Sequence, residues 1–88
     1  MTQQISPADI RVDLTVDCSG LLCPLPVYKA GLALKNLEPG QVLELISTDP
    51  GSLEDIPALA RQTGDALLAV EDRGATQVYW LEKKRGAP

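Results

Sequence analysis

Two prolines, Pro24 and Pro26, closely follow Cys23 and decide where the first helix of this chain can begin. Proline is favoured at the first helical position, because the N–H that it lacks would have no intrahelical acceptor there. Cys23 is therefore predicted as the N-cap residue and Pro24 as the first residue of a helix. A cysteine at this point faces unpaired N–H groups and the positive end of the helix dipole. Both favour the thiolate, so the sequence predicts a nucleophilic thiol with a lowered pKa.

The hydrophobic pattern on either side of this stretch predicts a strand and a helix. Apolar and polar residues alternate over residues 11–17, which indicates a half-buried strand. Residues 24–37 carry a helical stripe with spacings of three and four, formed by Val27, Ala30, Leu34 and Leu37. Gly31 lies beside this stripe and weakens a helix, so we expect it to allow close packing against the sheet.

The second half of the chain predicts a strand, a helix and a hairpin. Residues 41–48 are apolar on both faces, which favours an interior strand. Ser52 is a candidate helix cap, although Pro57 would move the start of the regular helix toward Asp55. Residues 66–71 and 76–83 predict two antiparallel strands, with Tyr79 or Trp80 in the core.

The resulting order βαβαββ predicts the fold class α/β, as an α+β two-layer sandwich. We expect a four-stranded mixed sheet with two helices packed on one face. All 88 residues form a single domain in this prediction, with a core of about residues 11–83 and flexible termini.

Composition excludes several classes of function. The chain has no histidine and only two cysteines, which excludes a Cys-His dyad, a histidine-containing metal site and a structural zinc site, so we expect no metal. The net charge is −4 and the one basic cluster is the solvated stretch 83–85, so we expect no nucleic-acid partner. Neither a signal peptide nor a membrane segment is indicated, which predicts a cytoplasmic protein with reduced thiols.

The stretch Gly20-Leu-Leu-Cys23-Pro24-Leu-Pro26 resembles the motif of the TusA family of small sulfur carrier proteins. The likeness extends over residues 12–83 and includes the βαβαββ order. It also covers four short features outside the motif: Asp17 at the first strand end, Pro39-Gly40, Asp49-Pro50 and Asp55-Ile56-Pro57.

This resemblance implies a sulfurtransferase role without a cofactor. Cys23 would accept sulfur as a persulfide and pass it to a partner protein, while Gly20, Pro24 and Pro26 shape the loop and the helix start. The donor would be a cysteine desulfurase or a rhodanese-like protein, and the sulfur would serve tRNA thiolation or sulfur oxidation.

Two other functions remain open from the residues themselves. One is a regulatory or protein-interaction module that uses the same face without sulfur chemistry. The other is a thiol redox sensor in which Cys18 and Cys23 form a disulfide. Cys18 is otherwise expected to be a small residue packed at the strand end, and Asp17 to orient the loop backbone.

Overall fold

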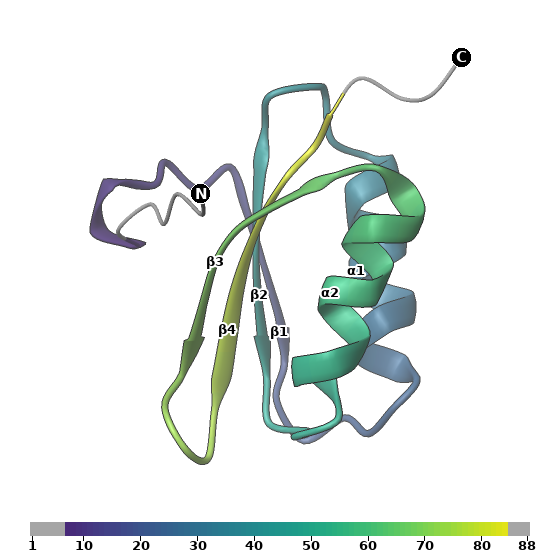
Figure 1. Cartoon of the computed structure of the whole chain (residues 1–88), viewed down its shortest axis with the longest axis vertical. Helices are drawn as coiled ribbons and strands as arrows, with labels where there is room; N and C mark the ends of the chain where they lie inside the picture. The colour runs from purple at the N-terminus through teal and green to yellow at the C-terminus, as the bar shows by residue number, and fades with distance from the viewer. Residues whose placement is uncertain (1–6, 85–88) are drawn as a thin grey trace.

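A computed structural model describes residues 7–84 as one four-stranded sheet with two helices on one face (Figure 1). The elements are η1 (Pro7–Asp9), β1 (Leu14–Cys18), α1 (Leu25–Lys35), β2 (Val42–Ser47), α2 (Ser52–Thr63), β3 (Ala66–Asp72) and β4 (Gln77–Glu82). The predicted βαβαββ order and the two-layer α+β fold are confirmed. The termini predicted to be flexible lie outside residues 11–83. Of these, residues 1–6 and 85–88 fall outside the described residues, whereas Pro7–Asp9 form η1.

The sheet has the strand order β1-β2-β4-β3 and is mixed, as predicted. β1 and β2 are parallel, whereas β4 runs antiparallel to both β2 and β3. The predicted interior position of the second strand is therefore confirmed. Because β1 and β2 are parallel neighbours, the loops that follow them leave the sheet at the same edge.

The sheet is covered on both faces. The larger cluster lies under the helices and contains Leu43, Leu45, Tyr79 and Leu81 of the sheet with Ala30, Leu34, Ile56 and Ala60 of the helices. On the opposite face, Ile10 and Val12 pack against Trp80 and its buried neighbours, and Figure 1 shows the N-terminal segment on that side. Tyr79 and Trp80 are thus both buried, on opposite faces. Within residues 7–84, no helix is long and apolar enough to span a membrane.

Two local predictions in the first half are corrected by the structure. The first strand begins at Leu14 rather than at residue 11, and Leu14 is 37% exposed because β1 is an edge strand. Gly31 does not pack closely against the sheet, since a Cβ atom at this position would meet nothing within 4 Å.

The second helix begins differently from either prediction. Its N-cap is Gly51, and Ser52 is the first helical residue, so the proposed Ser52 cap is wrong. The Ser52 hydroxyl instead lies in the core, hydrogen-bonded to the Tyr79 hydroxyl. Pro57 is accommodated inside α2 without delaying its start to Asp55.

Candidate functional site

The loops after β1 and β2 meet beside the start of both helices. Two hydrogen bonds join them directly: the Gly20 N–H donates to Thr48 Oγ1 at 2.8 Å, and the Cys23 N–H donates to Asp49 Oδ2 at 2.7 Å. Asp49 Oδ1 also accepts the Gly51 N–H at 3.1 Å. One carboxylate therefore ties the backbone at Cys23 to the first turn of α2.

The loop before Cys23 has a tight turn that the sequence explains. Asp17 accepts the Ser19 N–H at 2.9 Å, and hydrogen bonding by Ser19 lowers the pKa of the Asp17 carboxyl group. The expected role of Asp17 in orienting the loop backbone is confirmed by this contact. Gly20 has a φ of +82°, a left-handed conformation that glycine adopts without the steric cost of a Cβ atom.

The first helix begins one residue later than predicted. Pro24 is its N-cap and Leu25 its first residue, so the prediction of Cys23 as the N-cap is wrong. Pro26 is buried at the second helical position, where no N–H is needed. The Cys23–Pro24 peptide bond is cis. Because the helix begins at Leu25, Cys23 lies in the loop before it, and its N–H donates to Asp49 of the other loop.

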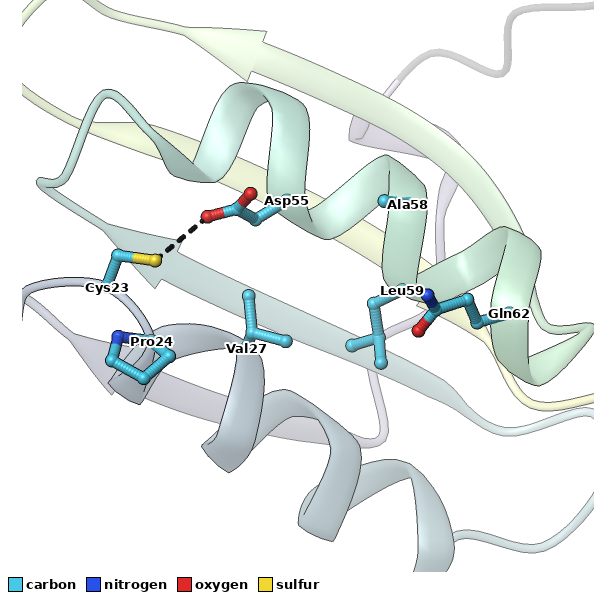
Figure 2. A pocket seen from close by; sticks show the side chains of 7 residues that line it. All are labelled: Cys23, Pro24, Val27, Asp55, Ala58, Leu59 and Gln62. Atoms are coloured by element: carbon cyan, nitrogen blue, oxygen red, sulfur yellow. Dashed lines mark hydrogen bonds between the residues drawn. The ribbon is translucent and has the colours of Figure 1, made fainter.

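The thiol of Cys23 is exposed but contacts a carboxylate. Its S–H donates to Asp55 Oδ2 of α2 across 3.1 Å, as Figure 2 shows. This hydrogen bond raises the pKa of Cys23, with further contributions from desolvation and from the charges of Asp55 and Asp49. The predicted lowering of the thiol pKa is therefore wrong, because the contact with Asp55, desolvation and the charges of Asp55 and Asp49 all raise it.

A cavity of about 280 Å³ opens beside this thiol, between the first turn of α1 and the length of α2 (Figure 2). Most of its lining is hydrocarbon, and the full set is Cys23, Pro24, Val27, Asp55, Ala58, Leu59 and Gln62. Between residues 7 and 84, no group of three or more Cys, Asp or Glu side chains is placed to hold a metal ion. The cavity therefore offers an apolar wall, one thiol and one carboxylate.

Cys18 differs from Cys23 in its exposure. It is fully buried at the end of β1, as expected of a packed small residue, and burial raises the pKa of its thiol. Both cysteines are free in the structure. With Cys18 buried and both thiols free, the structure gives the redox-sensor alternative no support.

Three residues of this site were not singled out as contacts of the motif from the sequence: Thr48, Asp49 and Asp55. Asp49 and Asp55 belong to stretches that carry the family resemblance, but local spacing does not reveal their contacts with a loop more than 20 residues away. The available signal was topological. If β1 and β2 are taken as a right-handed βαβ unit, the loops after both strands meet at one edge.

Comparison with known proteins identifies the relatives of this chain. The family model described as "Sulfurtransferase TusA" matches residues 14–83. The sulfur carrier protein TusA of Allochromatium vinosum is 44% identical over 72 residues, covering 82% of this chain and 93% of the relative. The sulfur carrier protein TusA of Pseudomonas putida is 37% identical over 76 residues, covering 86% of this chain and 95% of the relative.

Two further comparisons concern length and fold. An Aquifex aeolicus relative is 43% identical over 75 residues, which cover 85% of this chain but only 38% of that longer protein. A solved structure of a SirA-like protein from Desulfitobacterium hafniense superposes with a TM-score of 0.73 at 23% identity, covering 83% of this chain and 100% of that chain. This structural likeness supports the two-layer fold.

Proposed function

The chain belongs to the TusA family of sulfur carrier proteins, and we propose that Cys23 is the residue that carries the sulfur, as a persulfide. The observation that supports this proposal is the exposure of the Cys23 thiol at the cavity between the helices. The other thiol, Cys18, is fully buried and cannot meet a partner's sulfur without local opening.

The proposed transfer is an exchange between a thiol and a persulfide. The sulfur of Cys23 attacks the outer sulfur of a donor persulfide, R–S–SH, and a new S–S bond forms as the donor's S–S bond breaks. The donor leaves as R–SH and Cys23 becomes a persulfide, Cys23–S–SH. Delivery to the acceptor repeats this exchange in the opposite sense, so no external oxidant or reductant is consumed.

The three supporting motif residues have separate parts in this proposal. Gly20 permits the left-handed turn that brings the loop back beside Thr48. Pro24 forms part of the cavity wall next to the thiol, and Pro26 anchors the start of α1 in the core. Together they hold the backbone on both sides of Cys23, which limits the positions available to its sulfur.

The partners would dock on the exposed side of this loop. Leu22, directly before Cys23, is 71% exposed, and Leu25 and Tyr28 at the start of α1 are 44% and 63% exposed. Such side chains can be covered by a partner that must exclude water from the sulfur during transfer. We assign the donor role to a cysteine desulfurase or a rhodanese-like protein and place the relay in the cytoplasm, where thiols stay reduced.

A two-step relay experiment tests this function. The protein is loaded by a cysteine desulfurase with isotopically labelled cysteine, separated from the donor, and mixed with a rhodanese-like acceptor. Wild type should carry label and release it to the acceptor, whereas Cys23→Ser should do neither while still binding the donor. Retention of label transfer in Cys23→Ser would contradict the proposal. If no label passes through either protein but partner binding persists, the interaction-module alternative is favoured.

A further inference from the structure

The proton of the Cys23 thiol has one close acceptor in the described structure. Asp55 Oδ2 lies 3.1 Å from Cys23 Sγ, and Figure 2 shows the two side chains pointing toward each other from different elements. Asp55 comes from the first turn of α2, a helix held to the sheet by the buried Ser52–Tyr79 hydrogen bond. The position of α2 on the sheet therefore places the Asp55 carboxylate next to the Cys23 thiol.

The other groups at the site cannot take this role. Apart from the pair itself, the cavity lining consists of hydrocarbon side chains and the amide of Gln62, which does not titrate. The chain contains no histidine. The second nearby carboxylate, Asp49, is engaged by the backbone N–H groups of Cys23 and Gly51. Among the residues that line the cavity, Asp55 alone can accept a proton from the thiol.

We propose that Asp55 is a catalytic residue of sulfur transfer, which accepts the Cys23 proton as the thiol attacks the donor persulfide. This inference rests on the proposed function. As the new S–S bond forms, the S–H electron pair remains on Cys23 and the proton passes to the Asp55 carboxylate. The donor's S–S bond breaks with its electron pair on the leaving sulfur, and Asp55 then returns the proton to that sulfur, giving R–SH.

The electrostatics of the resting protein agree with this assignment. The contact with Asp55 raises the pKa of Cys23, so the thiol is protonated at neutral pH and must lose its proton during attack. A neutral thiol is also a poor target for oxidation. In the loaded carrier, a persulfide anion would be repelled by the Asp55 carboxylate and directed away from it toward the open side of the cavity.

The inference is tested by the rate of persulfide formation in Asp55→Asn, Asp55→Glu and Glu54→Gln, with cysteine persulfide as donor. Glu54 is the matched control, because it is an exposed carboxylate in the same helical turn without the contact to Cys23. Quenched samples are read by intact mass over a range of pH, and circular dichroism checks that each variant is folded.

Asp55→Asn should slow transfer about 10²-fold at neutral pH, the lower end of typical general-base effects. This loss should occur although the thiol pKa falls, and the rate should approach wild type at high pH, where solvent ionises the thiol. Asp55→Glu should restore most of the rate, and Glu54→Gln should stay near wild type. An Asp55→Asn variant as fast as wild type, or faster, at neutral pH would overturn the inference while leaving the carrier function intact. Failure of wild type to gain sulfur would overturn both.

Discussion

The buried hydrogen bond between Ser52 and Tyr79 makes a quantitative prediction about how the site is held. The two hydroxyl oxygens are 2.5 Å apart, and the residues are 2% and 0% exposed. Tyr79→Phe removes one partner and leaves the Ser52 hydroxyl buried without a hydrogen bond. This should lower the free energy of unfolding by about 1–3 kcal/mol. In a domain of this size, each kcal/mol lowers Tm by about 4–8 °C, so a loss of roughly 4–24 °C is expected.

A double-mutant cycle isolates this hydrogen bond from other effects. Ser52→Ala should lower the free energy of unfolding to a similar degree. The double variant should lose less stability than the two single losses added together, because neither hydroxyl is then left unsatisfied. A coupling of about 1–2 kcal/mol is expected for such a contact. Urea unfolding can be followed by fluorescence of the chain's one tryptophan, Trp80, which is 3% exposed.

The other tyrosine of the chain, Tyr28, supplies the matched control. Tyr28 is 63% exposed, so Tyr28→Phe should leave the unfolding midpoint unchanged. Additive effects of the two core substitutions, or a Tyr79→Phe variant as stable as wild type, would refute the claim that this bond anchors α2. Because Asp55 lies in the first turn of α2, a weakened anchor should also reduce its control over Cys23.

Three further predictions concern single residues. Gly31→Ala should stabilise the protein by about 0.5–1 kcal/mol in urea unfolding, since its Cβ would enter open space within a helix; destabilisation would contradict this. Asp49→Ala should lower stability by about 1–2 kcal/mol and speed hydrogen exchange at the Cys23 amide, and unchanged exchange would argue against the loop contact. Alkylation of Cys23 should rise with pH at a midpoint above the ordinary thiol pKa and shift downward in Asp55→Asn; a wild-type midpoint below the ordinary value would be inconsistent with the Asp55 contact. The same raised pKa means that the contact's contribution to stability is present below the unfolded thiol's pKa and is lost as pH rises through the folded value.

The sequence predicted those features of the fold that depend on local pattern. Periodicity identified the first strand and the first helix, the apolar faces of residues 41–48 identified the second strand, and the turn residues around Gly74 identified the final hairpin. Long-range contacts decided the rest. Ser52 has the side chain of a cap, but the Tyr79 hydroxyl in β4 offers it a buried partner.

The same distinction applies to the candidate site. Cys23 and its prolines stand out in one short stretch, and their arrangement favours a reactive thiol by local physics alone. The thiol pKa depends on Asp49 and Asp55, which a parallel pair of strands brings to the same edge of the sheet. The strand pairing brings together residues more than 20 positions apart in the sequence. The prediction from the helix N-terminus used only residues next to Cys23.

Intact mass after reaction with a persulfide donor tests the central claim most directly. Reduced wild type, Cys23→Ser and Cys18→Ser are each incubated with the donor, and the mass is read before and after treatment with a reductant. The account predicts that wild type and Cys18→Ser gain one sulfur atom, which the reductant removes, and that Cys23→Ser gains none. An unmodified wild type, or a Cys23→Ser variant that still gains sulfur, would contradict the assignment of Cys23 as the sulfur-carrying residue.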